Sequence, residues 1–237
     1  MAKIVILSGA GVSAESGIST FRDNNGLWEE YDVGIVCNYD SLDKNEDVTI
    51  EFYDKRRAEL KDKEPNHAHE LIAQLKKRHP NEIAIITQNV DNLFEKAGLA
   101  HKDVIHLHGF MPEVRCQNQS CNFLADIGYK KQNEAFNGLC PKCSTHLRPN
   151  IVFFGEAAPK YEEMQEELDD CELFIVIGTS GYVINTDRIV VNIENSILNN
   201  LEKSDAIYDE LYSKVLYKPA TQAIDEIAQD IESFIML

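Results

Sequence analysis

The feature of this sequence that most constrains its fold is a glycine-rich loop directly after a short apolar run near the N-terminus. The run from Ile4 to Leu7 consists of branched apolar residues, which is typical of a strand buried on both faces of a sheet. It leads into Gly9-Ala10-Gly11, where two glycines let the main chain turn sharply and approach a pyrophosphate, with the amides of a following helix directed at the negative charge. Alone the pattern is a weak signal, because an ordinary structural turn has a similar sequence.

Further short apolar runs predict a sheet built mainly of parallel strands, with helical patterns between several of them. We expect strands at Ile4 to Leu7, Ile83 to Thr87, Val104 to Leu107, Leu173 to Ile177 and Val190 to Ile193. One helix is expected after Asn66, which can cap its first turn, and another from Pro219 to the C-terminus. The alternation predicts an α/β fold, a Rossmann-like open parallel sheet with helices on both faces.

Two segments interrupt this alternation and look like insertions. The polar, acidic stretch over about residues 23–63 predicts an inserted helical segment, and the stretch over about 111–146 carries most of the cysteines and predicts a small lobe. The large Rossmann-like lobe would then comprise about residues 1–22, 64–110 and 147–237, all within a single domain spanning 1–237.

The charge balance excludes some classes of partner. Forty acidic against 23 basic residues give a net charge of −17, which repels phosphate backbones and anionic lipid surfaces. We expect no direct nucleic-acid binding, and no membrane span, because no long uninterrupted apolar window occurs. The N-terminus lacks a signal-peptide core, so we expect a cytoplasmic protein. The same charge would attract lysine-rich protein segments, although solubility alone also explains it.

Four of the six cysteines form two close pairs with the spacing of a metal site. The pairs are Cys116-x-x-x-x-Cys121 and Cys140-Pro-Lys-Cys143, and together they can surround one tetrahedral Zn²⁺ ion. Because all four ligands would be sulfur, no position remains for water, and the zinc is expected to be structural. Four free thiols or two disulfides are the alternative.

The glycine loop continues as Gly-Ala-Gly-x-Ser-x-x-Ser-Gly-Ile-x-x-Phe-Arg from Gly9 to Arg22, and this longer string resembles the signature loop of the sirtuins. Other sirtuin-like strings follow in the expected order across nearly the whole chain. They are Gln88-Asn89-Val90-Asp91, His108-Gly109, the four cysteines, Phe153-Phe154-Gly155-Glu156, Gly178-Thr179-Ser180 and Asn192-Ile193-Glu194. By resemblance, the chain is identified as a sirtuin, a family of NAD-dependent protein-lysine deacylases.

The resemblance implies where NAD binds. The glycine loop and the Gln-Asn-Val-Asp string would contact the phosphates, ribose and nicotinamide, and later strings would hold the adenosine half at the ends of strands. The implied residues are Gly9, Ala10, Gly11, Ser13, Glu15, Ser16, Gly17, Ile18, Phe21, Arg22, Trp28, Gln88, Asn89, Val90, Asp91, Gly178, Thr179, Ser180, Asn192, Ile193, Glu194 and Ala220. The match at Ala220 is poorer, because Lys218 stands where the family commonly has glycine.

In the family reaction, the acyl oxygen of a modified lysine attacks the ribose carbon that carries nicotinamide, and water finally releases lysine and O-acyl-ADP-ribose. The resemblance makes His108 the general base toward a ribose hydroxyl, which suits a side chain that titrates near neutral pH. Asn89 would orient ribose and water, and Asp91 would hold nicotinamide or the surrounding hydrogen bonds; loop caps are the alternative for both. Only the family register distinguishes His108 from His106, which would share its face if the strand continued.

A local pair of residues bears on which acyl group is removed. Helical spacing places Tyr53 and Arg56 on one face, where an arginine fork beside a phenol suits a carboxylate. The pair resembles the Tyr-x-x-Arg of sirtuins that remove succinyl or malonyl groups, while an exposed basic turn balancing Asp54 and Glu59 is the alternative. Cys37 stands where such enzymes often have an alanine in the acyl pocket, which leaves the width of the pocket, and the balance with acetyl, open.

The segment Val152, Phe153, Gly155 and Glu156 resembles the edge that sirtuins pair with an extended substrate peptide, a mode that reads main chain more than sequence. A buried strand is the alternative for Val152 and Phe153, while Gly155 suggests a close main-chain approach. The expected substrates are proteins with acylated lysines. A mono-ADP-ribosyltransferase using the same machinery, and an NAD-sensing binding module, are the alternative functions.

Overall fold

The computed structural model describes residues 3–19 and 31–236. Three of the expected NAD-binding residues, Phe21, Arg22 and Trp28, lie outside the described residues. Within the described part of the chain, no helix combines the length and the apolar character needed to cross a membrane.

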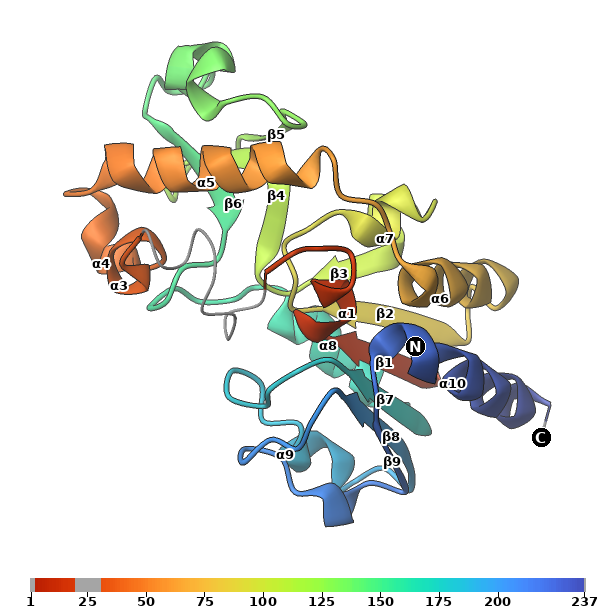
Figure 1. Cartoon of the computed structure of the whole chain (residues 1–237). Helices are drawn as coiled ribbons and strands as arrows, with labels where there is room; N and C mark the ends of the chain where they lie inside the picture. The colour runs from red at the N-terminus through yellow and green to blue at the C-terminus, as the bar shows by residue number, and fades with distance from the viewer. Residues whose placement is uncertain (1–2, 20–30, 237) are drawn as a thin grey trace.

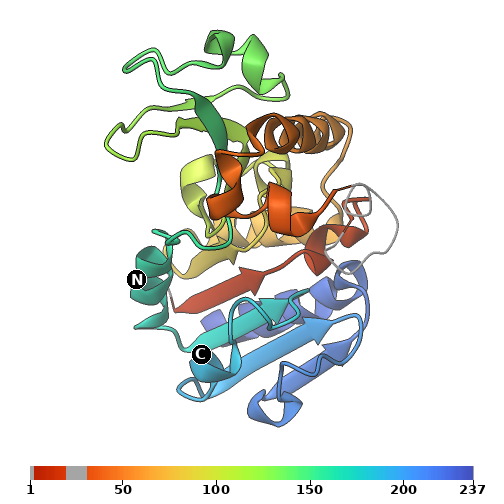
Figure 2. The same cartoon turned by 90° about the vertical axis from the view of Figure 1, so that its left-hand side faces the viewer.

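A six-stranded parallel sheet forms the centre of the molecule (Figures 1 and 2). Its strand order is β3-β2-β1-β7-β8-β9, and each neighbouring pair is parallel. The strands are β1 (Ile4–Ser8), β2 (Ile83–Thr87), β3 (Val104–His106), β7 (Leu173–Ile177), β8 (Asn195–Asn200) and β9 (Lys214–Tyr217). This confirms the Rossmann-like open sheet expected from the sequence.

Both faces of the sheet are covered, which explains why its central strands have continuous apolar sequences. Because successive side chains of a strand point to opposite faces, Ile4 and Ile6 pack in one core with α6 (His67–Arg78) and α10 (Ala220–Ile235). Val5 and Leu7 pack in the other, with α8 (Tyr161–Leu168) and α9 (Asp187–Val190). Figure 1 shows α6 and α10 side by side on one face.

The two helices predicted from capping and spacing, α6 and α10, begin where the sequence predicts. Asn66 caps α6, with its side-chain oxygen accepting from the N–H groups of Ala68 and His69, and His69 completes a capping box. Pro219 is the N-cap residue of α10, whose buried positions recur at helical spacing and pack on the sheet.

The strand predicted at Val190 to Ile193 was wrong. Val190 ends the short helix α9, and the strand β8 begins only at Asn195. This strand was not recognised in the sequence because it contains polar residues. Asn199 can be buried, at 1% exposed, because its amide donates 2.9 Å hydrogen bonds to the main-chain oxygens of Leu216 and Lys218. The edge strand β9 was not expected at all.

Two further groups of elements are inserted into this framework. One consists of the helices α3 (Val33–Val36), α4 (Tyr39–Leu42) and α5 (Glu46–Leu60), which share a separate apolar core with Met111, Ile151 and Phe153. The other contains an antiparallel sheet of order β5-β4-β6, drawn in yellow-green to green in Figure 1, where β4 and β6 run past α5. Its strands are β4 (Gly109–Cys116), β5 (Leu124–Asp126) and β6 (Leu147–Ile151).

The remaining described elements are short. They are α1 (Gly11–Ala14), α7 (Leu93–Lys96) and the 3-10 helices η1 (His101–Asp103), η2 (Gln132–Glu134), η3 (Phe136–Gly138) and η4 (Asp209–Leu211).

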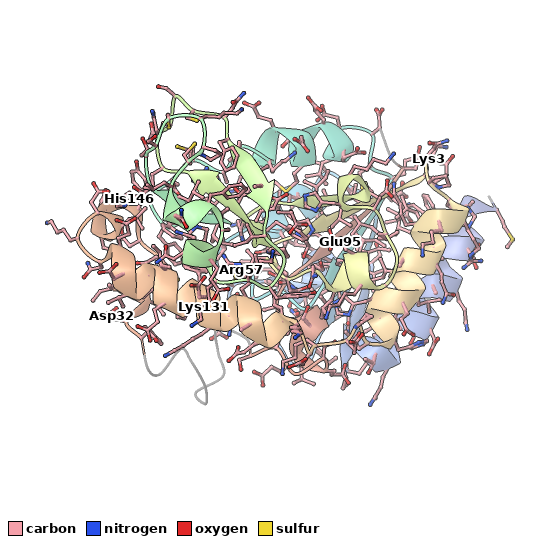
Figure 3. The ribbon with its side chains drawn as sticks, turned by 90° about the horizontal axis from the view of Figure 1, so that it is seen from above. Lys3, Asp32, Arg57, Glu95, Lys131 and His146 are labelled. Atoms are coloured by element: carbon pink, nitrogen blue, oxygen red, sulfur yellow. The ribbon has the colours of Figure 1, made fainter. Side chains whose placement is uncertain are left out.

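A buried arginine fastens the two inserted groups together. Arg57, labelled in Figure 3, is fully buried, with its Nε–H donating to the carbonyl of Met111 at 2.9 Å. Its guanidinium also bonds Asp54 at 2.6 Å, and the same Asp54 oxygen accepts the N–H of Gln132 at 2.9 Å. The helix α5 is therefore held in a fixed orientation over β4, which positions the residues on its other face.

Candidate active site

A cavity of about 540 Å³ opens at the carboxyl edge of the parallel sheet, beneath the inserted helices. Open α/β sheets place ligands at this edge. It brings together residues from the glycine loop, the loop after β2, helix α5 and the segment after β6. The lining residues expected from the sequence are Ala10, Ser13, Gly17, Ile18, Tyr53, Arg56, Gln88, Asn89, Val90, Asp91, His108, Val152, Phe153, Gly155 and Glu156.

The glycine loop packs directly against the loop after β7. A Cβ atom at Gly11 would lie 2.6 Å from the Cα of Gly178, so neither loop can carry a side chain at this crossing. The helix that follows is only one turn long, and the N–H groups of Gly11, Val12 and Ser13 donate to the carbonyls of Gly178, Gly9 and Ala10. These N–H groups are therefore not free to bind a pyrophosphate, in contrast to what the sequence suggests. The turn instead lets the main chain of the glycine loop lie close to the cavity.

Ser13 is the centre of a buried hydrogen-bond network that holds the two expected catalytic polar residues. Its hydroxyl donates to Asp91 Oδ2 at 2.9 Å and accepts from the Asn89 amide at 3.0 Å. His69 Nε2 lies 3.3 Å from the same hydroxyl, and Nδ1 accepts the Asn66 N–H. Burial lowers the pKa of His69 to about 4, so it is a neutral donor to Ser13. Asp91 and Asn89 are thus fixed in orientation, and Asp91 also acts as a loop cap, because its Oδ1 accepts the N–H of Leu93 at 3.1 Å.

His108 projects into the cavity from the turn after β3. Its Nδ1 lies 3.0 Å from the carbonyl of Gln88, which assigns the proton to Nδ1 and leaves the lone pair of Nε2 on the cavity side. Burial lowers the pKa of His108, and the bond to Gln88 opposes this shift. Gln88 itself is held by its amide, which donates to Thr179 Oγ1 at 2.9 Å. A neutral imidazole in this orientation can accept a proton.

A tyrosine that sequence reasoning missed caps this base. The hydroxyl of Tyr161, at the start of α8, lies 3.1 Å from His108 Nε2 and lines the same cavity. With the lone pair on Nε2, the phenol is the donor. A substrate hydroxyl that approaches His108 must therefore share or displace the hydrogen bond from Tyr161.

His106 does not share the position of His108, because β3 ends at His106. Its ring is 5% exposed, with Nδ1 bonded to the carbonyl of Asn89 at 3.1 Å and Nε2 to Glu95 at 2.8 Å. It is not among the residues that line the cavity. The structure thus separates the two histidines, which the sequence could distinguish only by resemblance.

The residues expected at the adenosine half of NAD are divided between the two edges of the sheet. Thr179, Ser180 and Ala220 follow β7 or β9 and lie at the carboxyl edge. In contrast, Asn192, Ile193 and Glu194 precede β8 and lie at the opposite, amino edge. Their expected place at a strand end depended on the wrong strand assignment. The carboxyl end of β8 instead carries Asn199 and Asn200.

Two other residues of the glycine loop face away from the cavity lining. The Glu15 carboxylate accepts hydrogen bonds from the N–H and hydroxyl of Thr221, at 3.1 and 2.7 Å, and thereby ties α1 to the start of α10. The Ser16 hydroxyl is buried without a hydrogen-bond partner among the described residues.

Tyr53 and Arg56 lie at the end of the cavity under α5. Tyr53 is 4% exposed, its ring stacks on Phe153 at 5.6 Å, and its hydroxyl is 3.4 Å from the thiol of Cys37. The Arg56 side chain is 13% exposed and its guanidinium is 3.9 Å from Glu59, which also lines the cavity. The turn is therefore not exposed, although Arg56 does pair with Glu59 as that alternative expected.

The segment after β6 is held by main-chain bonds that differ from those expected. The N–H groups of Val152 and Phe154 donate to the carbonyls of His108 and Cys37, and that of Phe153 donates to the Glu156 carboxylate. The same carboxylate is gripped by Arg115 and Arg148 at 2.8 to 2.9 Å. Glu156 therefore positions this segment, and an added peptide strand must use other main-chain groups.

Gly155 is required here for its conformation. It has φ +90°, whereas nothing lies within 4 Å of a Cβ built on it. The close main-chain approach expected at this glycine is not present.

The four paired cysteines converge in the lobe beyond β4, where yellow sulfur atoms gather in Figure 3. Their sulfurs lie within 4.8 Å of one another, with Cys116 and Cys143 at 3.4 Å and Cys121 and Cys140 at 3.7 Å. These separations are too long for disulfides. Zinc–sulfur bonds of about 2.3 Å in a tetrahedron separate the sulfurs by roughly 3.8 Å, so the cluster fits one Zn²⁺ ion with no position left for water.

The remaining two cysteines lie apart from this cluster. Cys171 is half-buried beside the sheet. Cys37 is buried and lines the cavity in contact with Tyr53, at the pocket position that the resemblance implied.

Comparison with known proteins decides the family. The family model described as the Sir2 family matches residues 9–185, from the glycine loop through the catalytic strings and the cysteine cluster to the loop after β7. The chain belongs to the Sir2 family. Since the Sir2 match includes the glycine loop and the residues around His108, the resemblance noted in the sequence is confirmed.

Individual Sir2 relatives cover nearly the whole chain. An NAD-dependent protein deacylase of Campylobacter jejuni (strain RM1221) is 50% identical over 235 residues, which are 99% of this chain and 97% of the relative. A solved Sir2 homolog–NAD complex matches with TM-score 0.83 and 31% identity over 97% of this chain and 89% of that one. A Sir2 protein bound to acetylated peptide matches with TM-score 0.78 and 26% identity over 97% and 93%. This chain is an NAD-dependent enzyme of the sirtuin type.

Proposed function

We propose that this Sir2 enzyme removes acyl groups that end in a carboxylate, succinyl and malonyl, from lysine side chains of proteins. NAD is the co-substrate, and nicotinamide and O-acyl-ADP-ribose are the other products. The observation that carries the proposal is that Tyr53 and Arg56 line the same cavity as His108 and Asn89. One bound acyl-lysine can therefore reach both pairs.

Charge at the acyl end favours a carboxylate. Arg56 is largely buried, and although burial lowers its pKa, a guanidinium stays charged at neutral pH. Its guanidinium pairs with the Glu59 carboxylate at 3.9 Å, and an incoming acyl carboxylate would share this guanidinium in the planar fork that arginine offers. A carboxylate bound there gains two parallel hydrogen bonds from one side chain.

Two neighbours of Arg56, Cys37 and Tyr53, are neutral donors, whereas Glu59 carries a negative charge. Burial raises the pKa of Cys37, and it raises the pKa of Tyr53 well above the ordinary value. Both groups therefore stay protonated at neutral pH and do not repel an acyl carboxylate. The phenol of Tyr53 can donate a second hydrogen bond beside the guanidinium.

The middle of the cavity suits the apolar part of the substrate. Met111, Ile151 and Phe153 line it and belong to the apolar core under α5. These side chains can pack on the methylenes of lysine and of the acyl chain.

The catalytic end supplies a base and a set of orienting groups. NAD supplies the ribose carbon that loses nicotinamide and accepts the acyl oxygen. His108 takes a proton at Nε2, with its ring held by the bond from Nδ1–H to Gln88. Asn89 orients ribose and water, and Asp91, bonded by Ser13, holds the network on the nicotinamide side.

The four cysteines would hold one structural Zn²⁺ ion, whose contribution is to tie together the turns after β4 and before β6. The negative net charge of −17 favours lysine-rich protein segments as substrates. Neither feature takes part in acyl recognition.

The test compares succinyl-, malonyl- and acetyl-lysine peptides of one sequence, with the native protein, Tyr53→Phe and Arg56→Met. Losing a hydrogen bond to a charged group costs about 1.5–3 kcal/mol, so kcat/KM for the two acidic acyl groups should fall roughly 10- to 150-fold. Acetyl should change by less than about threefold. Lys55→Met is the matched control, since Lys55 is a neighbouring, more exposed cation on α5.

Equal loss for all three acyl groups would exclude carboxylate recognition while leaving a deacylase. If no nicotinamide were released with any peptide, the deacylase function itself would be excluded. Mass analysis of the peptide separates deacylation from transfer of ADP-ribose to a side chain.

A further inference from the structure

A cluster of two histidines and one glutamate lies outside the cavity and has no part in the proposed reaction. Glu95 comes from α7, His101 from η1 and His106 from the end of β3. The ligand atoms of all three lie within 4.8 Å of one another. Figure 3 labels Glu95 beside α7.

The distances within the cluster suit a metal ion. Glu95 Oε1 is 2.8 Å from His106 Nε2 and 3.1 Å from His101 Nδ1. A tetrahedral ion with metal–nitrogen and metal–oxygen bonds of about 2.0–2.1 Å separates its ligand atoms by roughly 3.3 Å. The two glutamate–histidine pairs therefore need to open by only a few tenths of an ångström to admit an ion.

The surroundings hold His106 in the form that binds metals. Its Nδ1–H donates to the carbonyl of Asn89, which leaves the lone pair of Nε2 directed at Glu95. Metal-bound histidines almost always donate their second nitrogen to such an oxygen. A lone pair facing a carboxylate oxygen at 2.8 Å requires a positive charge between them, either a proton or a metal ion.

A further observation favours the ion. The second Glu95 oxygen, Oε2, is buried and has no hydrogen-bond partner among the described residues. The rings of His101 and His106 stack at 5.3 Å with an interplanar angle of 18°, and both pack on Phe110. Because an imidazole binds a metal ion in its own plane, the more exposed ring of His101 must turn for both histidines to reach one ion.

We propose that Glu95, His101 and His106 form a binding site for a divalent transition metal ion, Zn²⁺ above all, that is separate from the four-cysteine cluster. Two imidazoles and a carboxylate are the ligand set of zinc sites that keep one position open, so water completes the tetrahedron. The four-cysteine cluster has no such position. This second ion is therefore the exchangeable one.

The experiment measures zinc content on tag-free full-length protein whose cysteine cluster is already loaded. After equilibrium dialysis against micromolar Zn²⁺, native protein should hold two ions per chain. His101→Ala and Glu95→Gln should hold one. His67→Ala is the matched control, because the side chains of His67 and His101 are each 48% exposed and each pairs with a carboxylate. It should hold two ions, since His67 is not part of the cluster.

Cobalt gives a second measurement that does not depend on counting. Co²⁺ is added to protein that holds zinc only in its cysteine cluster, and it should give visible ligand-field bands without thiolate charge-transfer absorption. His101→Ala and Glu95→Gln should lose these bands. Both variants should keep their melting temperature within a few degrees. The proposal is overturned if native protein holds only one zinc ion, or if the second ion survives in His101→Ala and Glu95→Gln.

Discussion

The two ends of the cavity are built by different principles. At the catalytic end, Ser13 lies in α1 after β1, Asn89 and Asp91 lie in the loop after β2, and each side chain is bonded to another polar group. At the acyl end, Tyr53 and Arg56 come from one inserted helix and face an apolar wall. In the proposed function, the chemistry thus depends on residues placed by the sheet, whereas the choice of acyl group depends on the inserted helix α5.

This difference predicts distinct effects for mutations at the two ends of the cavity. A change at the catalytic end should lower turnover of every acyl group by the same factor. A change at the acyl end should alter the ratio between acyl groups.

The largest effect is expected for His108→Gln. Glutamine can keep a hydrogen bond to the Gln88 carbonyl but cannot take a proton from a hydroxyl. Loss of a general base should lower kcat about 10²- to 10⁴-fold, by the same factor for succinyl- and acetyl-lysine peptides. Product formation followed by mass spectrometry at saturating NAD measures this.

His79→Gln is the control, because His79 lies away from the cavity, where it pairs with the Glu232 carboxylate. It should retain native turnover. A loss in His108→Gln confined to one acyl group would contradict the separation of the two ends.

A smaller effect is expected for Cys37→Ala, at the acyl end. The thiol occupies space beside the Tyr53 hydroxyl and lies 3.4 Å from it. Its removal should lengthen the acyl site and free the phenol. Succinyl exceeds malonyl by one methylene, which in a fitted pocket is worth about 10-fold, so the succinyl-to-malonyl ratio of kcat/KM should rise by about this factor.

Cys171→Ala controls for the loss of a thiol, since Cys171 packs beside the sheet away from the cavity. Its succinyl-to-malonyl ratio should equal the native one. An unchanged ratio in Cys37→Ala would show that Cys37 does not limit the length of the site.

Much of the fold could be predicted because the central strands are buried on both faces. Strands such as β1 and β7 are continuous apolar runs, and α6 begins at a capping residue that acts within its own first turn. The prediction failed at β8, where Asn199 is buried by hydrogen bonds to a strand that follows it in the chain. Such a strand looks like a polar loop until its partner is known.

The residues of the site also divide into those that the sequence could place and those that it could not. Loops after parallel strands meet at one edge, so Gln88 to Asp91 and His108 could be placed together from the sequence. The contacts of Tyr161 with His108, and of Glu156 with Arg115, join residues more than forty positions apart. No local spacing indicates such pairs, and they are the ones that the sequence did not reveal.

The smallest effect is expected at Tyr161, and it concerns the pKa of the base. Burial lowers the pKa of His108 below its ordinary value of 6.5, so the acid limb of kcat/KM should have its midpoint below pH 6.5. Activity is lost as the pH falls through this value, because protonated His108 cannot accept a proton. Tyr161 donates to Nε2 and stabilises the neutral ring, and it also covers the ring from water.

Tyr161→Phe removes that donor and should therefore raise the midpoint toward 6.5, by about half a unit to one unit for one neutral hydrogen bond. The shift should be the same for succinyl- and acetyl-lysine peptides, since Tyr161 belongs to the catalytic end. Tyr182→Phe, at an exposed tyrosine, should leave the pH profile unchanged. A midpoint that moved down, or moved for one acyl group alone, would mean that Tyr161 acts on the substrate rather than on the base.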